Sequence, residues 1–109
     1  HDSALFGWMS DNGDPDNFAD VLLGCNSIKT GSNAARWCDK GYDSLVQKAK
    51  LTSNPAERAK LYGQAQEIFY QQAPWIALAN GKTFYVTRSN VTGYSVSLMG
   101  SDFSKAKLN

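Results

Sequence analysis

The sequence predicts an α/β fold, and three observations carry that prediction. An apolar run typical of a strand stands near the start, two helical patterns follow each other in the middle, and β-prone segments come after them. No internal repeat or low-complexity tract interrupts this order. Strands and helices mixed along one chain are typical of layered α/β domains. A single strand–helix–helix–strand unit leaves strand edges and helix faces uncovered. We therefore expect further parts of the protein to complete the sheet.

The first element is a short buried strand, predicted over residues 4–8 from Ala4-Leu5-Phe6-Gly7-Trp8. Residues 9–20 then carry a dense set of turn signals, the dipeptides Asn-Gly, Asp-Pro and Asp-Asn. A loop at the end of a strand is a common place for binding groups. We therefore expect a functional loop over residues 9–20, leading into a short helix through residues 18–23.

Two helices are predicted next. Apolar residues recur at helical spacing over residues 41–51. The second helix begins with a strong start signal, Asn54-Pro55-Ala56-Glu57, which combines a capping side chain, a proline at the first helical position and a glutamate three residues after the cap. It should end near Gln72, because Pro74 follows. Its buried face is predicted to be one apolar stripe, Leu61, Tyr62, Ala65, Ile68 and Phe69.

The remaining segments are β-prone. A short strand is predicted over residues 75–79, and residues 83–87 follow after an Asn-Gly turn signal. These two segments by themselves read as a hairpin with a two-residue turn. Residues 93–96 are a further strand candidate, but the periodicity of residues 88–109 is weak.

Composition excludes several classes of function. The 109 residues are 42% hydrophobic and 12% aromatic, which is not the composition of a disordered chain. The net charge is +1, with 11 basic and 10 acidic residues, so there is no electrostatic case for a nucleic-acid partner or an anionic membrane. No apolar run approaches the length that spans a bilayer. His1 is the only histidine, so no serine has a base partner, and we expect no enzyme activity.

The cysteines and aspartates of the sequence do not match the spacing of a known metal site. A single histidine and the two cysteines Cys25 and Cys38 argue against a zinc site. The aspartates that begin with Asp11 do not have the spacing of an EF-hand calcium site. Gly13 and Pro15 stand at the third and fifth positions, where calcium ligands would be needed. We therefore expect no metal and no cofactor. The cysteines form either a disulfide, which would order a Gly- and Ser-rich loop and imply an oxidising compartment, or two free thiols.

A series of motifs in order covers nearly the whole chain. It resembles the peptide-binding family of bacterial extracytoplasmic solute-binding proteins, in particular the dipeptide-binding branch. The residues that carry this resemblance are Gly7-Trp8, Asp11 to Phe18, Leu22-Leu23, Cys25, Gly31-Ser32-Asn33, Arg36-Trp37-Cys38, Tyr42, Arg58, Leu61-Tyr62, Gln64-Ala65-Gln66, Gln72-Ala73-Pro74, Gly93-Tyr94 and Gly100.

The resemblance implies a C-terminal portion of a two-lobed periplasmic-binding-protein fold, with a mixed sheet and flanking helices. Residues 1–80 would be the end of the larger, peptide-clamping lobe, and residues 81–109 would cross over and return into the first lobe. Residues 83–87 would then be a crossover segment instead of a hairpin strand. The Cys25–Cys38 disulfide becomes the favoured state. The implied partners are the remainder of the polypeptide, a peptide ligand and the membrane permease of an ABC importer, in the periplasm or on a lipid-anchored extracytoplasmic surface.

The resemblance also implies a ligand site. Asp11 would receive the α-ammonium group of a peptide, Trp8 would form part of the cleft wall, and the backbone at Gly7, Trp8 and Met9 would lie along the ligand. The arginine that receives the ligand's carboxylate in this family has no match here. A local interpretation of Asp11, without the resemblance, is an aspartate that organises its own turn.

Three functions remain open from the sequence. The first is the binding of dipeptides or short peptides. The second, on the same scaffold, is the binding of haem or glutathione. The resemblance implies it, because some relatives with this motif bind those ligands and Met9 stands where many relatives have a small polar residue. The third is a free-standing small interaction domain, which would require these residues to fold alone.

Overall fold

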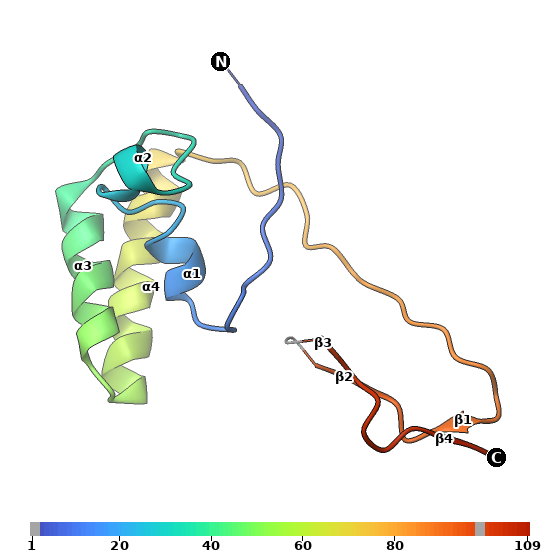
Figure 1. The fold of residues 1–109 in the computed structure, drawn as a ribbon. Coiled ribbons are helices and arrows are strands. Elements are labelled where there is room, and N and C mark those ends of the chain that lie inside the picture. The colour runs from blue at the N-terminus through green and yellow to red at the C-terminus, as the bar shows by residue number, and fades with distance from the viewer. Residues whose placement is uncertain (1–2, 98–99) are drawn as a thin grey trace. The chain divides into compact units, whose positions relative to one another are not determined.

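The computed structural model describes residues 3–97 and 100–109. The chain divides into two compact units, His1–Ile76 and Ala77–Asn109. In its described part the first unit holds four helices, and the described part of the second holds four short strands. Figure 1 labels them. The predicted division into lobes at residues 80 and 81 concerns a larger protein and stays a prediction.

Helices α3 (Lys40–Leu51) and α4 (Pro55–Gln72) run side by side as a helical pair (Figure 1). Both helix predictions are confirmed. The side chain of Asn54 caps α4 by accepting hydrogen bonds from the backbone N–H groups of Ala56 and Glu57 at 3.0 and 3.2 Å. The helix ends at Gln72, as Pro74 predicts, and Ala73 closes it with a left-handed backbone.

The core of the first unit lies between α3, α4 and the turn that follows helix α1 (Asp16–Ala19). Leu22 and Val46 are fully buried there. Helix α1 begins two residues before the predicted helix at 18–23 and ends at Ala19, after which the chain continues as turns. The buried apolar residues are Leu22, Leu23, Tyr42, Val46, Ala49, Tyr62 and Ala65.

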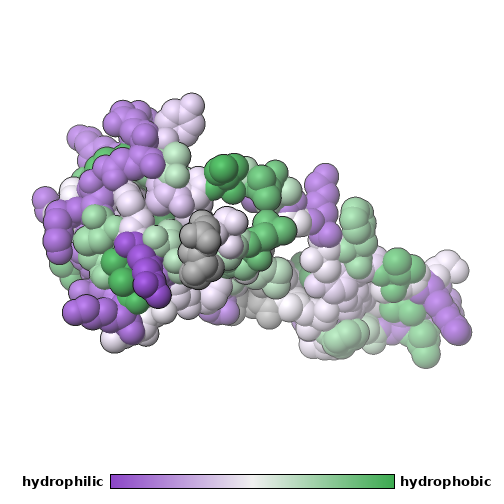
Figure 2. All heavy atoms as spheres, turned by 90° about the horizontal axis from the view of Figure 1, so that it is seen from above, coloured by the Kyte–Doolittle hydropathy of each residue, from purple (hydrophilic) through white to green (hydrophobic). Residues whose placement is uncertain are grey.

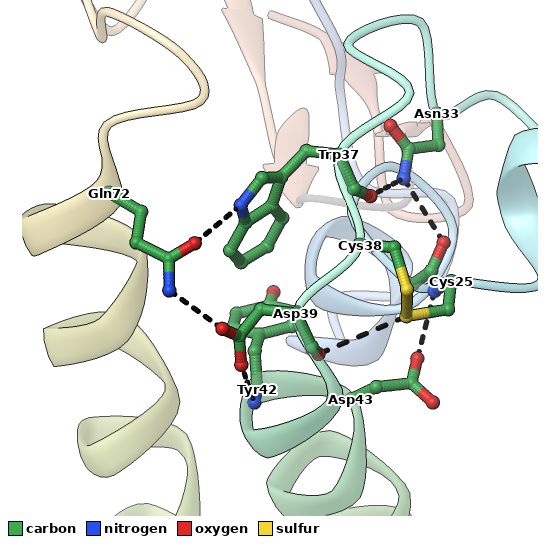
Figure 3. Close-up of a disulfide and its surroundings, with 9 residues drawn as sticks. Cys25, Asn33, Trp37, Cys38, Asp39, Tyr42, Asp43 and Gln72 are labelled. Atoms are coloured by element: carbon green, nitrogen blue, oxygen red, sulfur yellow. Dashed lines mark hydrogen bonds between the residues drawn. A yellow bond between two sulfur atoms is a disulfide. The ribbon is translucent and has the colours of Figure 1, made fainter.

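Cys25 and Cys38 form a disulfide that closes the loop containing helix α2 (Ser27–Thr30). Figure 3 shows how polar side chains surround it. Asn33 donates to the carbonyl oxygens of Gly24 and Trp37 at 3.1 and 2.8 Å. The Gln72 amide joins this loop to the end of α4 by accepting from the Trp37 indole at 2.8 Å and donating to a carboxylate oxygen of Asp39 at 2.7 Å. Cys25 and Cys38 are therefore joined in a disulfide and are not two free thiols.

The second unit contains two antiparallel strand pairs. Strand β1 (Val91–Thr92) pairs with β4 (Lys107–Leu108). Strand β2 (Ser95–Ser97) pairs with β3 (Gly100–Asp102), and it overlaps the strand candidate at 93–96. Four elements of two or three residues each are too short to form an extended sheet.

Three strand predictions are wrong for this chain. Residues 4–8, 75–79 and 83–87 are irregular in the structure, and no hairpin forms at the Asn-Gly turn signal. Nor is the segment 4–8 buried, since Leu5 is 85% exposed. A strand is stabilised by backbone hydrogen bonds to a neighbouring strand. The described residues supply no such neighbour to these segments. Ile76 and Phe84 are exposed, whereas Trp75 is partly buried against the core. Figure 2 shows that apolar residues, drawn in green, lie at the surface.

Among the described residues, no helix combines the length and the apolar character that crossing a bilayer requires. The same residues contain no cluster of three or more His, Cys, Asp or Glu side chains placed to bind a metal ion.

Candidate functional site

The acidic loop, residues 10–16, connects the irregular N-terminal segment to helix α1. Short side-chain bonds organise it from within. The Ser10 hydroxyl accepts from the backbone N–H of Gly13 at 2.8 Å, and the Asn12 amide oxygen accepts from the N–H of Asp14 at 2.9 Å. Gly13 has a φ of 72°, a conformation that glycine adopts without a steric penalty. The turn signals in the sequence therefore correspond to real turns.

Asn17 links this loop to the residues before it. Its amide oxygen accepts hydrogen bonds from the Trp8 indole Nε1 at 2.8 Å and from the backbone N–H of Asp11 at 3.3 Å. Its amide nitrogen donates to Asp11 Oδ2 at 3.2 Å. Asn17 is only 9% exposed, and it is the second residue of α1. One buried amide thus connects two of the residues that the sequence assigned to a ligand site.

A second connection ties the acidic loop to α4. Nη2 of Arg58 contacts both carboxylate oxygens of Asp14, at 2.6 and 2.7 Å. Nε of Arg58 donates to the carbonyl oxygen of Ala49 at 3.1 Å, and its guanidinium lies 5.4 Å from the ring centroid of Tyr62. The Arg58 hydrogen bond, helped by the backbone N–H of Asp16, lowers the pKa of Asp14.

The pKa values of the two neighbouring carboxyl groups of the loop, Asp14 and Asp16, are shifted in opposite directions. Partial burial is the main cause that raises the pKa of Asp16, and its hydrogen bond and charge repulsion with Asp14 raise it further. Asp16 Oδ1 is buried without a hydrogen-bond partner. Asp14 is therefore the group that holds the negative charge opposite Arg58. Asp14 links the loop to α4, and within the loop it also accepts from the backbone N–H of Asp16 at 2.9 Å.

The four residues predicted for the ligand site lie at the surface. Gly7 and Asp11 are exposed, Met9 is 79% exposed and Trp8 is 36% exposed. Asn17 donates a hydrogen bond to Oδ2 of Asp11. The other carboxylate oxygen, Oδ1, has no hydrogen bond or ion pair with the described residues. The structure therefore brings Trp8 and Asp11 together through Asn17. It gives Gly7 and Met9 no polar side-chain contact among the described residues.

An apolar groove in the first unit lies elsewhere. This groove of about 320 Å³ is lined by Phe18, Tyr62, Phe69 and Trp75, among others, and none of the four predicted ligand residues lines it. The predicted site is thus an exposed acidic and aromatic corner of the first unit. Chemically, it offers a carboxylate that can accept hydrogen bonds from a cation, beside an indole ring.

Sequence reasoning missed two residues that build this corner. These residues are Asn17 and Arg58, which belong to the motifs of the resemblance but have no role predicted from the sequence. An asparagine that follows an Asp-Pro turn signal and stands among apolar helix residues was a usable signal for Asn17. The partner of Arg58 could not be read from the sequence, because 44 positions separate it from Asp14.

Comparison with known proteins gives the chain its relatives. No family model matches it. Di/tripeptide-binding protein 2 of Pseudomonas aeruginosa is 48% identical over 110 residues, which cover 100% of this chain and 21% of that protein. A crystal structure of the dipeptide-binding protein from Pseudoalteromonas sp. SM9913, in complex with Met-Leu, superposes with a TM-score of 0.74 at 32% identity, over 94% of this chain and 20% of that one. Over its whole length the chain is similar to one portion of di/tripeptide-binding proteins.

The structural similarity confirms the fold class, an α/β portion of a periplasmic-binding-protein fold. The chain spans about a fifth of the length of the relatives that it matches, in agreement with the prediction of a C-terminal portion. The relatives are binding proteins by name. One of them, haem-binding protein A of Haemophilus influenzae, is 46% identical over 100 residues, which cover 92% of this chain and 18% of that protein.

Proposed function

We propose that the complete protein carrying this chain is the solute-binding component of an ABC importer. It binds dipeptides or short peptides in a cleft between two lobes, and Asp11 receives their free α-ammonium group. The ligand-bound, closed form is the state that the membrane permease reads. The protein acts in the periplasm or on a lipid-anchored extracytoplasmic surface, in keeping with the disulfide between Cys25 and Cys38.

The observation that carries this proposal is the state of the Asp11 carboxylate. It is exposed, one oxygen is held by Asn17, and no described cation neutralises it. A peptide's α-ammonium group is a compact cation with three hydrogen-bond donors. A charge-assisted hydrogen bond of this kind contributes about 1.5–3 kcal/mol net. The carboxylate also disfavours peptides with a blocked amino group, since these would bury it without a partner.

The segment before Asp11 supports a peptide as the ligand. The structure gives residues 3–9 no backbone hydrogen bonds to other described residues. An extended ligand can pair with such free N–H and C=O groups along Gly7, Trp8 and Met9. The exposed face of Trp8 then offers apolar contact area next to the ammonium group.

Haem is the second candidate ligand, and one observation favours it. A haem-binding relative is about as similar to this chain as the peptide-binding one. Met9 is 79% exposed beside Trp8, and it adds apolar surface that a large flat ligand can cover. Glutathione remains the third ligand to include in a test, because it carries a free α-ammonium group like a peptide.

The test uses Asp11→Asn in the complete protein. Asparagine keeps an acceptor for Asn17 and removes the charge, so the affinity for Met-Leu should fall about 10- to 100-fold. Calorimetry measures this with Met-Leu, N-acetyl-Met-Leu, glutathione and haem. The wild type should prefer Met-Leu over its acetylated form.

Asp102→Asn is the matched control. Asp102 is also an exposed aspartate that accepts from a nearby backbone N–H, that of Ser104 at 2.8 Å, but it belongs to the second unit. Its replacement should leave the affinity unchanged. Unchanged Met-Leu binding by Asp11→Asn would contradict the assignment of Asp11, and tighter binding of haem than of any peptide would favour the second candidate.

A further inference from the structure

We propose that Asn17 is a positioning residue that sets the preference of this site for a free ammonium group. It does so by holding the Asp11 carboxylate and the Trp8 indole in one fixed arrangement. This inference rests on the proposed function, in which Asp11 is the ammonium acceptor. It adds a residue that does not touch the ligand and acts through the one that does.

The geometry shows one side chain serving three partners. The amide oxygen of Asn17 uses both of its acceptor directions, for the Trp8 indole N–H and for the Asp11 backbone N–H. Its amide nitrogen holds Oδ2 of Asp11. The backbone and the carboxylate of Asp11 are thus both held by one amide, which restricts the rotation of this side chain. Oδ1 of Asp11 is left as the oxygen that can accept from a ligand.

Among the side-chain types, an amide fits the hydrogen bonds made at position 17. The side chain here must accept two hydrogen bonds and donate one, all from a buried place. A carboxylate could accept the same two bonds, but it would bring a second negative charge to within hydrogen-bond distance of Asp11 Oδ2. A hydroxyl is too short to bridge the same atoms, and an aliphatic side chain would leave the Trp8 and Asp11 N–H groups without their acceptor.

Asn17 can serve as a fixed point because helix α1 is itself held by the core. The backbone N–H of Asn17 donates to the carbonyl oxygen of Asp14 at 3.2 Å, and Arg58 holds Asp14 against α4. At the end of α1, the Tyr42 hydroxyl donates to the carbonyl oxygen of Ala19 at 2.9 Å. The position of Asp11 is therefore coupled to the helical core through Asn17. A site residue supported in this way loses less freedom when a ligand binds.

The experiment is a double-mutant cycle in the complete protein with Asn17→Leu, Asp11→Asn and the double variant. Calorimetry gives the affinity for Met-Leu and for its analogue in which a hydroxyl group replaces the α-ammonium group. The readout is the ratio of the two affinities. This ratio does not depend on the fraction of protein that is folded. It can therefore be compared between variants of different stability.

We expect Asn17→Leu to lower the preference for Met-Leu over the hydroxyl analogue about 3- to 10-fold, the effect of one net hydrogen bond. Asp11→Asn should abolish the preference, and Asn17→Leu should then lower it no further, because Asn17 acts through Asp11. The smaller change Asn17→Ala should give the same result as Asn17→Leu. Asn33→Leu is the matched control, a second buried asparagine that contacts neither site residue, and it should leave the ratio unchanged.

The outcomes separate the two proposals. If Asp11→Asn abolishes the preference while Asn17→Leu and Asn17→Ala preserve it, this inference is wrong and the proposed function stands. An equal loss of affinity for both ligands with an unchanged ratio would also overturn it, because that is the effect of a merely structural residue. If the wild type binds both ligands equally, the proposed function fails and this inference fails with it.

Discussion

The ion pair between Arg58 and Asp14 connects the acidic loop with the core of the first unit. Both side chains are about 30% exposed, so solvent screens their attraction only in part. The guanidinium is also fixed by the carbonyl oxygen of Ala49. Its contribution to stability depends on the charge of Asp14 and therefore on pH.

We expect Arg58→Met to lower the melting temperature of the complete protein at pH 7, and the difference from the wild type to shrink in acid. The folded state lowers the pKa of Asp14 below its ordinary value of 3.8. A group with a lowered pKa stabilises the fold above its unfolded pKa, and that contribution is lost as the pH falls through the folded pKa. Melting curves between pH 7 and pH 2.5 measure the difference.

Lys60→Met is the control for the loss of a positive charge on the same helix. Lys60 is exposed, and the structure assigns it no ion pair with the residues it describes. Its replacement should change the melting temperature little at any pH. A pH-independent effect of Arg58→Met would mean that the packing of its side chain, and not the ion pair, stabilises the loop.

At the scale of structural elements, the Cys25–Cys38 disulfide closes the loop that contains helix α2. Its helix α2 has only four residues, and no side-chain hydrogen bond caps its start. Several polar contacts hold the loop against α3 and α4. Among them, the Cys25 N–H donates to a carboxylate oxygen of Asp43 at 2.9 Å, and Gln72 bridges Trp37 and Asp39. The Tyr42 N–H and the Gln72 amide lower the pKa of Asp39.

Reduction of the Cys25–Cys38 disulfide should destabilise the complete protein by about 3 kcal/mol, the value expected for a loop of this length. The reason is that the cross-link restricts the unfolded chain. Urea unfolding with and without reductant measures the change. The variant with serine at both cysteine positions should match the reduced protein and should not respond to reductant. Equal stability of the oxidised and reduced forms would show that the polar contacts alone order the loop.

Considered as a whole molecule, the chain contains one well-packed unit and long exposed apolar segments. Ile76, Phe84 and Val86 are 82%, 83% and 94% exposed, and they belong to a stretch without regular structure. A soluble protein seldom leaves such a run uncovered. We infer that other parts of the complete protein supply the strands and side chains that cover it.

In the isolated chain, we expect amide hydrogen exchange to separate these parts. Amides of α3 and α4 should exchange slowly, because they are hydrogen-bonded within a packed helical pair. Amides of residues 77–87 should exchange at rates close to those of an unfolded peptide, since the structure gives them no backbone partner among the described residues. In the complete protein, residues 83–87 should become protected. Protection of these residues in the isolated chain would contradict the inference and favour a free-standing domain.

Local signals were sufficient for several parts of this protein. The cap at Asn54, the stop before Pro74 and the apolar spacing of α3 and α4 each lie within a few residues, so the sequence alone determined these helices. The turn residues of the acidic loop are local in the same sense. The motif order was also enough to recognise the resemblance to peptide-binding proteins, which the relatives confirm.

The tertiary structure alone decided the arrangement of the site. Asn17 joins Trp8 to Asp11, and Arg58 meets Asp14 across 44 positions of sequence, neither of which a periodic pattern encodes. The strand predictions failed for the same physical reason. A β-prone segment becomes a strand only when a neighbour satisfies its backbone hydrogen bonds, and none of the described residues takes that place for residues 4–8, 75–79 or 83–87.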